Sequence, residues 1–350
     1  MSSPRSPDYR VEADITVAHT LPGSFYADAG AFVRLRERVF ARTWQWLGPL
    51  DDVAGLESLA PRTLLPGLVD EPLLLTRDAA GMLRCMSNVC THRGNILVGA
   101  ACRAKEIRCG YHSRRFDLAG KMTFMPEFKG ARDFPTPSDD LPQVKLGEWA
   151  GQGFVSLDPA APLDAFLEGA ITSIAGDPVA SLAYDPSRDR DFHVHAHWAL
   201  YVENFLEGFH IPFVHAALNE VVDYGTYAGE LHRYSNLQLA RDRQGEVAAR
   251  YWWVFPNLML NVYPWGISVN VVEPQAIDRT RVLFRSFVWD ESKLERGAGA
   301  GLDRVEAEDE AIVEAVARGV RSRLYTHGRY SPTRERGVHH FHRLLCEFLG

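Results

Sequence analysis

The alternation of apolar and polar residues predicts one amphipathic helix near the start of the chain. Apolar residues recur there at the three- and four-residue spacing of a helix that packs one face against a core. These residues are Phe32, Leu35, Val39 and Phe40. We therefore predict a short helix over residues 28–43.

Between residues 44 and 159 the apolar runs are short and are interrupted by Gly, Pro and Asp. Leu73–Leu75 and Gly153–Leu157 have the length and composition of buried strands. This pattern predicts an all-β domain.

Helical and strand patterns alternate in the remainder of the chain. Helices are predicted near residues 200–217 and over 302–324, and several strands are predicted across 237–290. The chain is therefore expected to be an α+β protein in three parts: an N-terminal helical segment at 1–43, a β domain at 44–159 and a second domain at 160–350.

Composition fits a globular protein and weakens several classes of function. Of the 350 residues, 46% are hydrophobic and 24% are charged, which are ordinary values. The formal net charge of −7 and the lack of Lys/Arg-rich runs argue against nucleic acid, and no apolar stretch approaches a membrane span. The five cysteines are too scattered for a disulfide scaffold, so we expect a cytoplasmic location.

Two short Cys/His pairs carry the most specific chemistry in the chain. One pair is Cys90 and His92, the other is Cys109 and His112, and sixteen residues lie between the pairs. Each pair offers one thiolate and one imidazole, which suits a [2Fe–2S] cluster with two Cys on one iron and two His on the other. Zinc accepts the same ligands, but zinc modules usually place the two Cys together and the two His together. We therefore predict a [2Fe–2S] cluster on these four residues.

This pattern resembles the Rieske signature. Rieske proteins of respiratory complexes tie their two ligand loops with a disulfide, whereas the corresponding residues here are Asn95 and Tyr111. The resemblance is therefore to the oxygenase type of Rieske domain. Arg114 stands where that family more often has Trp. Its charge is interpreted either as attracting a donor protein or a neighbouring subunit, or as part of an ordinary solvated loop.

A second group of candidate ligands lies near the middle of the chain. Glu203, Glu207 and His210 have a spacing that would place them on one face of a helix. His215 would leave that face, but Pro212 can break or kink the helix and let both imidazoles converge. Two His and one carboxylate form the facial triad of non-haem Fe(II) oxygenases, which leaves positions open for O₂ and substrate.

The third ligand is expected from the last predicted helix. Asp309 shares a stripe with apolar residues, whereas Glu306, Glu310 and Glu314 form another stripe that is expected to face solvent. A carboxylate that points into an apolar face is unfavourable unless it is paired or bound to metal. We therefore prefer Asp309 as the ligand, with Glu308 as the alternative.

Two other histidine groups are interpreted as structural. His193, His195 and His197 alternate at strand spacing and are expected to form a solvent-facing row. His339, His340 and His342 are expected in an ordinary packed tail.

Over nearly its whole length the chain resembles the oxygenase component, the α subunit, of Rieske non-haem iron ring-hydroxylating and demethylating enzymes. Within that group it is most similar to the choline, carnitine and glycine betaine monooxygenases and stachydrine demethylase. The similarity to that branch is carried by Glu203–Glu207, Pro256–Asn261 and Gly337–His342.

The resemblance implies a helix-grip (START-like) second domain, in which an antiparallel sheet wraps around a long C-terminal helix. It also implies a homotrimer in which electrons pass from the cluster of one subunit to the mononuclear Fe(II) of its neighbour through a bridging carboxylate. Glu207 stands at the bridging position, where Asp is more common, and Asn204 is expected to hydrogen-bond near the iron. These are the two predicted catalytic residues.

The electron supply is expected from outside the chain, because it contains no Gly-x-Gly-x-x-Gly run and no plant-type ferredoxin cysteine spacing. NAD(P)H would act through a separate reductase, either a ferredoxin reductase or a flavin/iron–sulfur reductase, and O₂ would be the co-substrate.

The branch resemblance favours hydroxylation or N-demethylation of a small quaternary ammonium or N-methyl compound. Ring hydroxylation or O-demethylation of an aromatic substrate is the alternative, because aromatic side chains suit a flat ring as well as a cation. The aromatic residues expected on strands around the cavity are Trp252, Trp253, Phe255, Tyr263 and Trp265. A Rieske electron-transfer protein, the non-enzyme alternative, would need only the first third of the chain.

Overall fold

The computed structural model describes residues 8–350, which form two compact units. The smaller unit is residues 41–160, and the larger unit combines residues 8–40 with residues 161–350. The first segment is therefore part of the larger unit. Its helix α1 spans Ala29–Arg38, and the Asp28 carboxylate caps it by accepting hydrogen bonds from the backbone N–H groups of Gly30 and Ala31.

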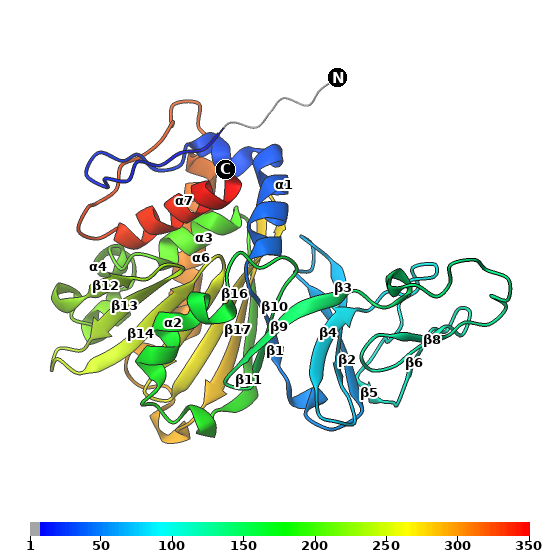
Figure 1. Cartoon of the computed structure of the whole chain (residues 1–350). Helices are drawn as coiled ribbons and strands as arrows, with labels where there is room; N and C mark the ends of the chain where they lie inside the picture. Colours follow the sequence, from blue (N-terminus) through cyan, green and yellow to red (C-terminus); the bar gives the residue numbers. More distant parts are fainter. Residues whose placement is uncertain (1–7) are drawn as a thin grey trace. The chain divides into compact units, whose positions relative to one another are not determined.

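The smaller unit is built from antiparallel strands (Figure 1). Its main sheet has the order β1-β10-β9-β4-β3-β2-β5 and a second, small sheet has the order β6-β7-β8. The strands are β1 (Gln45–Pro49), β2 (Ser58–Leu64), β3 (Glu71–Arg77), β4 (Leu83–Ser87), β5 (Cys102–Arg103), β6 (Ile107–Arg108), β7 (Arg115–Phe116), β8 (Met122–Phe124), β9 (Gln143–Trp149) and β10 (Gln152–Ser156). Cys90 and Cys109 lie in a buried cluster with Leu74, Met86 and Phe116, so the core of this unit supports both predicted ligand loops.

The larger unit contains one antiparallel sheet in the order β11-β17-β16-β15-β14-β13-β12. Its strands are β11 (Ala183–Val194), β12 (Ala228–Leu231), β13 (Ser235–Arg241), β14 (Val247–Val254), β15 (Leu258–Tyr263), β16 (Gly266–Ala276) and β17 (Arg279–Val288). The helices are α1, α2 (Leu163–Ile174), α3 (Trp198–Phe205), α4 (Ile211–Val214), α5 (Ala216–Val221), α6 (Leu302–Gly319) and α7 (Arg336–Leu349). The predicted α+β class with antiparallel sheets is confirmed.

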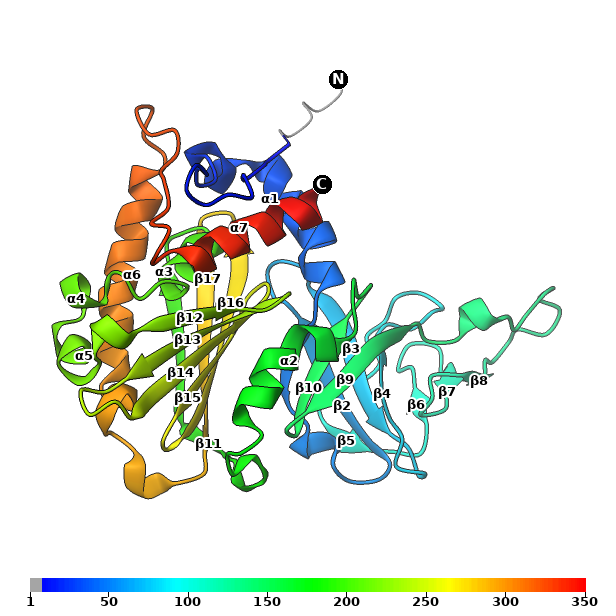
Figure 2. The same ribbon diagram turned by 60° about the vertical axis from the view of Figure 1, so that its left-hand side comes forward.

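Helices cover both faces of this sheet, with α2 on one side and α6 on the other (Figure 2). Successive side chains of a strand point to opposite faces. Trp252 accordingly points toward α2, where its indole N–H donates to the Ser173 hydroxyl at 3.0 Å. Its neighbour Tyr251 points to the other face and lines the cavity described below.

The helix predicted near residues 200–217 is three short helices, and the prediction of one continuous helix is wrong. The chain leaves helix α3 after Phe205 and turns through Gly208, where a Cβ atom would lie 2.5 Å from the Tyr227 ring. Pro212 does not interrupt a helix. It lies in the first turn of α4, where a backbone N–H has no intrahelical partner and proline is tolerated.

The last part of the chain also differs from its prediction. Helix α6 ends at Gly319 rather than near residue 324, and the tail that was expected to be packed forms helix α7 at Arg336–Leu349. Three histidines concealed the apolar spacing of α7, yet His342 and His339 are buried. Burial also lowers the pKa of His340 to about 4, so this imidazole is neutral and packs within the protein.

Candidate active site

Two loops with the same backbone hydrogen bonds lie in the smaller unit, one after β4 and one between β6 and β7. In each loop the cysteine N–H donates to the carbonyl of the fifth residue after it at 2.8 Å, for Cys90 and for Cys109. Each cysteine carbonyl accepts from the N–H of the fourth residue at 3.0 Å. That fourth residue is left-handed in both loops, with φ of 72° at Gly94 and 60° at Ser113. The two cysteines therefore occupy equivalent positions.

The four predicted cluster ligands gather where these loops meet. Cys90 and Cys109 are both 2% exposed, and the rings of His92 and His112 lie 4.8 Å apart between centroids. Burial raises the pKa of the Cys109 thiol, but hydrogen bonds from the backbone N–H groups of Tyr111 and His112 outweigh it and lower the pKa below its usual value. The Nδ1 atom of His112 is buried and has no hydrogen-bond partner among the described residues. Burial raises the pKa of the Cys90 thiol. Two thiols and two imidazoles, one of them with an unpartnered nitrogen, fit a Rieske cluster.

Asn95 and Tyr111, the residues at the positions of the disulfide in other Rieske proteins, contact the predicted ligands. The amide nitrogen of Asn95 lies 3.7 Å from the Cys109 sulfur, a distance typical of a weak N–H···S hydrogen bond. The Tyr111 ring lies 3.7 Å from the His112 ring between centroids, and Tyr111 is 59% exposed.

Arg114 is buried, and its predicted place on a solvated loop is wrong. Its side chain is 2% exposed and forms an ion pair with Asp139 at 3.2 Å. It also donates to the Thr91 hydroxyl at 2.7 Å and lies over the Phe134 ring. Because Thr91 belongs to the first loop and Arg114 to the second, this side chain links the two loops and cannot attract a donor protein from solvent.

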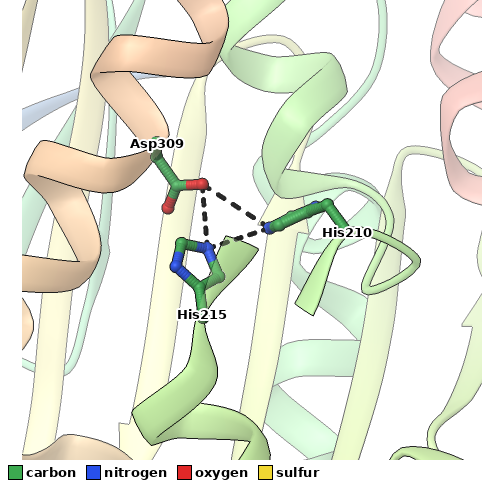
Figure 3. A group of neighbouring side chains, drawn as sticks. All are labelled: His210, His215 and Asp309. Atoms are coloured by element: carbon green, nitrogen blue, oxygen red, sulfur yellow. Dashed lines mark hydrogen bonds and ion pairs between the residues drawn. The ribbon is translucent and has the colours of Figure 1, made fainter. Parts of the chain in front are cut away.

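Three predicted iron ligands converge in the larger unit (Figure 3). The Nε2 atoms of His210 and His215 are 3.1 Å apart, and Asp309 Oδ1 lies 3.0 Å from the His215 nitrogen and 3.5 Å from the His210 nitrogen. In octahedral coordination with bonds of about 2.1 Å, adjacent ligand atoms lie about 3 Å apart. The spacing and the His₂–carboxylate donor set therefore fit one face of an octahedral metal ion.

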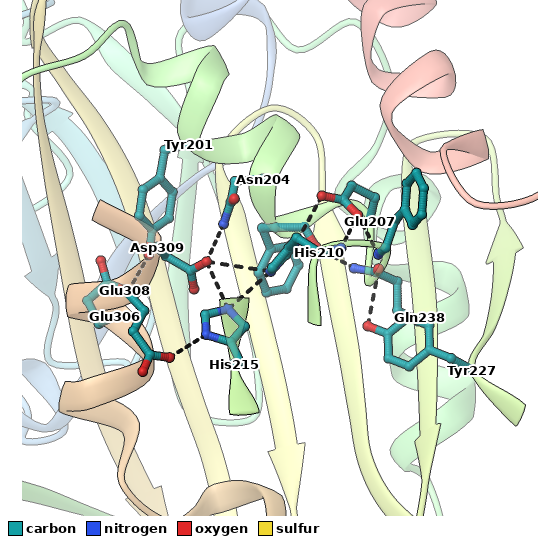
Figure 4. Close-up of polar contacts among 12 residues, drawn as sticks. Tyr201, Asn204, Glu207, His210, His215, Tyr227, Gln238, Glu306, Glu308 and Asp309 are labelled. Atoms are coloured by element: carbon teal, nitrogen blue, oxygen red, sulfur yellow. Dashed lines mark hydrogen bonds and ion pairs between the residues drawn. The ribbon is translucent and has the colours of Figure 1, made fainter. Parts of the chain in front are cut away.

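Each of the three side chains has a second partner that fixes its orientation (Figure 4). Glu207 contacts Nδ1 of His210 at 2.7 Å, and Glu308 contacts Nδ1 of His215 at 2.7 Å. Asn204 donates its amide N–H to Asp309 Oδ1 at 2.7 Å. Carboxylates on Nδ1 leave both Nε2 atoms free to face a metal. Burial lowers the pKa of His215, but the hydrogen bonds of its ring with Asp309 and Glu308 outweigh this effect and raise the pKa above its usual value.

Glu207 also determines the backbone around His210. Its carboxylate accepts hydrogen bonds from the backbone N–H groups of Phe209 and His210, the latter at 3.1 Å. The expected single helical face of Glu203, Glu207 and His210 is therefore wrong. Glu203 stays in α3 and points elsewhere, toward the Tyr26 hydroxyl at 2.7 Å and His342 at 3.0 Å.

Helix α6 presents a different face from the one predicted. Ile312 and Val316, expected in the core, are 40% and 42% exposed, whereas Glu306, expected in solvent, is 4% exposed. Asp309 is nevertheless turned inward, with its side chain 16% exposed. Its neighbour Glu308 holds the outer nitrogen of His215, so the two carboxylates have different positions in the site.

A cavity of about 100 Å³ lies beside these three side chains. Among the described residues that line it, none is a lysine or an arginine. Its lining is Tyr201, Asn204, Phe205, Glu207, His210, Ile211, His215, Leu218, Tyr227, Gln238, Tyr251, Asn261, Tyr263, Asn270, Phe284, Ala298, Leu302, Val305, Glu306 and Asp309. Of the five aromatic residues expected on strands around the cavity, most were expected in the core and one or two were expected to face the substrate; Tyr263 belongs to this lining, and the other four are buried elsewhere.

Glu306 and Tyr201 were not identified from the sequence. The Tyr201 hydroxyl donates to Glu306 at 2.6 Å, and burial raises the pKa of Glu306 to about 8 although that hydrogen bond lowers it. The available signal was spacing, because Glu306 precedes Asp309 by three residues and a helix places such pairs side by side.

The histidine row before α3 is only partly exposed. His193 and His195 are exposed, as expected, but His197 is 2% exposed, so the prediction for His197 is wrong. Its Nδ1 accepts the backbone N–H of Ala199 at 3.3 Å and caps α3. This cap holds the helix that carries Asn204.

Comparison with known protein families identifies both units. Residues 43–135 match the Rieske [2Fe–2S] domain, and residues 180–350 match the ring hydroxylating alpha subunit (catalytic domain).

Individual relatives cover most of the chain. Spinach (Spinacia oleracea) chloroplastic choline monooxygenase is 25% identical, over 95% of this chain and 79% of the relative. The carnitine monooxygenase oxygenase subunit of Escherichia coli strain K12 is 27% identical, over 94% of each chain.

Solved structures share the fold. The quaternary ammonium Rieske monooxygenase CntA in complex with γ-butyrobetaine superposes with a TM-score of 0.79 at 24% identity, over 97% of each chain. Naphthalene 1,2-dioxygenase with indole bound superposes with a TM-score of 0.72 at 17% identity, over 95% of this chain and 92% of that chain.

The chain belongs to the Rieske non-haem iron oxygenases and is an oxygenase component with a Rieske domain and a ring-hydroxylating-type catalytic domain. Its cofactors are those of the family, a Rieske [2Fe–2S] cluster and a mononuclear non-haem iron. The predicted cofactors are thereby confirmed, and the resemblance noted in the sequence is confirmed as well. No helix within residues 8–350 has the length and apolar character needed to span a bilayer.

Proposed function

We propose that this chain is the terminal oxygenase of a two-component system that oxidises a small quaternary ammonium or N-methyl compound with O₂. The observation that carries the proposal is the His210, His215 and Asp309 triad, which borders a cavity lined by aromatic and acidic side chains and by no lysine or arginine among the described residues. When bound, the iron supplies O₂ activation at the positions that the three protein ligands leave open.

We assign four ligands to the cluster and three to the iron. Cys90, Cys109, His92 and His112 would hold the cluster, because their loops present two thiols and two imidazoles together. His210, His215 and Asp309 would hold the iron. Glu308 is not assigned as an iron ligand, because it contacts Nδ1 of His215 whereas Asp309 lies beside Nε2.

Glu207 and Asn204 would support the iron from outside its ligand set. Glu207 fixes the tautomer and orientation of His210 through Nδ1. In the proposed trimer, the same carboxylate would also contact a cluster ligand of another subunit. Asn204 directs one Asp309 oxygen toward the histidines. A solved CntA structure is described as revealing inter-subunit electron transfer, which supports a trimer with the same arrangement here.

The electron donor would be a separate NAD(P)H-dependent reductase, as expected because the sequence has no Gly-x-Gly-x-x-Gly run and no plant-type ferredoxin cysteine spacing. A choline monooxygenase and a carnitine monooxygenase oxygenase subunit match 95% and 94% of this chain, which supports an ammonium substrate. A positively charged methylated nitrogen is stabilised by aromatic faces and carboxylates, both of which line this cavity.

The proposal is tested by supplying the purified chain with a surrogate reductase and NADH. Choline, glycine betaine, carnitine, stachydrine and simple arenes are then compared by substrate-dependent O₂ uptake and by product analysis, since uptake alone includes uncoupled O₂ reduction. Oxidised product from at least one ammonium compound is expected. Product from arenes alone would overturn the substrate proposal and leave the family assignment intact.

A further inference from the structure

Two residues that line the cavity carry buried acceptor atoms without partners among the described residues. Oε1 of Glu306 and Oδ1 of Asn261 make no hydrogen bond among the described residues, although the two side chains are only 4% and 6% exposed. Both residues line the cavity beside the iron triad. Buried polar atoms without partners are rare and unfavourable in proteins, which indicates that a bound molecule supplies the missing donors.

Asn261 is held on a rigid part of the sheet. It lies in β15 opposite Tyr251 of β14 and Ser268 of β16. It is also the last residue of the Pro256–Asn261 segment noted in the sequence. The first amide of that segment is used differently, since Asn257 donates to the Val272 carbonyl at 3.0 Å. Asn257 is therefore structural, whereas Asn261 keeps a free acceptor.

Glu306 is a buried carboxyl group without a lysine or arginine partner among the described residues. The Tyr201 hydroxyl donates to one carboxyl oxygen at 2.6 Å, and the other oxygen has no hydrogen-bond partner among these residues. Glu207 and Asp309 line the same space, and among the described lining residues there is no lysine or arginine. An ionised carboxylate in such surroundings is unfavourable unless a cation lies beside it. Burial accordingly raises the pKa of Glu306 to about 8.

Building on the proposed function, we infer that the cavity selects a small organic cation with a hydroxyl group and no carboxylate. Glu306 is the counter-charge of its ammonium group, and Asn261 accepts the hydrogen bond of its hydroxyl group. A zwitterion would bring its carboxylate into a lining that already has three acidic side chains and no lysine or arginine among the described residues. Buried without a partner, that carboxylate would oppose binding.

Four probes separate charge, hydroxyl and carboxylate in the holoenzyme. Choline carries the charge and the hydroxyl, 3,3-dimethylbutan-1-ol is its uncharged isostere, tetramethylammonium lacks the hydroxyl, and glycine betaine carries a carboxylate. Dissociation constants are measured by calorimetry. We expect choline to bind at least about tenfold more tightly than each of the other three, a ratio that corresponds to the loss of one charged or hydrogen-bonded contact.

Two variants assign the two contacts. Glu306→Gln keeps the hydrogen bond from Tyr201 but removes the charge, so the preference for choline over its uncharged isostere should disappear. Asn261→Ala should remove the preference for choline over tetramethylammonium. Matched controls are Glu310→Gln, a half-buried carboxylate of the same helix outside the cavity, and Asn236→Ala, a buried amide whose oxygen also lacks a partner. Both controls should keep the wild-type preferences.

An unchanged charge preference in Glu306→Gln would show that Glu306 is only a neutral hydrogen-bonded acid and would overturn the inference. Tighter binding of glycine betaine than of choline to the wild-type protein would overturn it as well, even if no variant folds. These results are distinct from failure of the proposed function. Oxidation of a betaine would preserve that function while removing this inference, whereas oxidation of arenes alone would remove both.

Discussion

The two metal-binding regions of this chain are built in different ways. In the smaller unit, four candidate ligands come from two loops with the same backbone hydrogen bonds, and all lie within residues 90–112. In the larger unit, His210 and His215 flank the short helix α4, and Asp309 comes from α6 almost one hundred residues later. The first region is a local structure, and the second exists only when the whole catalytic unit has folded.

This difference predicts which changes are confined to one centre. Cys109→Ser or His112→Ala should abolish the cluster's visible absorption and turnover, because in each variant one cluster iron loses one of its two protein ligands. His210→Ala should keep the absorption and lose the mononuclear iron, with turnover also abolished. Metal analysis and visible spectra of the purified variants test both statements. Loss of both centres in His210→Ala would mean that the two regions are not independent.

The assignment of the third ligand gives the next largest effect. Asp309→Ala should reduce mononuclear iron occupancy and activity by at least about tenfold. Glu308→Ala should have a smaller effect, because it lowers the affinity for iron only by releasing the His215 ring. Iron content after dialysis against a weak chelator measures the difference. A larger loss in Glu308→Ala would transfer the ligand role to that residue.

Glu207→Gln tests the connection between the two regions. The amide retains the shape of the side chain but removes the negative charge that contacts His210 Nδ1 at 2.7 Å. We expect both metal centres to remain and electron transfer from cluster to iron to slow by about tenfold to a hundredfold. Single-turnover oxidation of the pre-reduced cluster reports that rate. A wild-type rate would exclude Glu207 from the transfer path.

The same contrast explains how far the sequence could predict the molecule. The four Cys/His side chains could be predicted together, since they are close in sequence and their spacing is specific, and the structure brings them together. Asp309 lies beside the Nε2 atoms of both histidines, as the ligand prediction requires, but it was chosen from a stripe that included the exposed Ile312 and Val316. Glu306 was missed because its burial depends on Tyr201, which lies more than one hundred residues away. Tertiary contacts of this kind leave no local periodicity.

Arg114 tests whether the local region depends on a buried ion pair. Arg114→Met keeps much of the side-chain volume but leaves Asp139 and Thr91 without their partner. We expect the smaller unit to lose about 3 kcal/mol of unfolding free energy. Urea unfolding followed by cluster absorption measures this change. Arg132→Met, at an exposed position of the same unit, should have little effect, and equal midpoints for the two variants would contradict the role of the pair.

The smallest expected effect concerns the acid stability of the larger unit, where His197 caps helix α3. Burial lowers the pKa of His197 to about 3, far below its usual value near 6.5, so the unfolded chain takes up the proton first. The contribution of neutral His197 to stability is therefore complete above pH 6.5 and is lost as the pH falls toward 3. Each pH unit in that window costs at most about 1.4 kcal/mol.

His197→Asn should remove this acid sensitivity, because asparagine can still accept the Ala199 N–H at the start of α3 but cannot be protonated. The difference in melting temperature between pH 7.5 and pH 5 should therefore be smaller in the variant than in the wild type. His195→Asn changes an exposed histidine two residues earlier and should keep the wild-type difference. If His197→Asn is as acid-sensitive as the wild type, protonation elsewhere must unfold the region that carries Asn204.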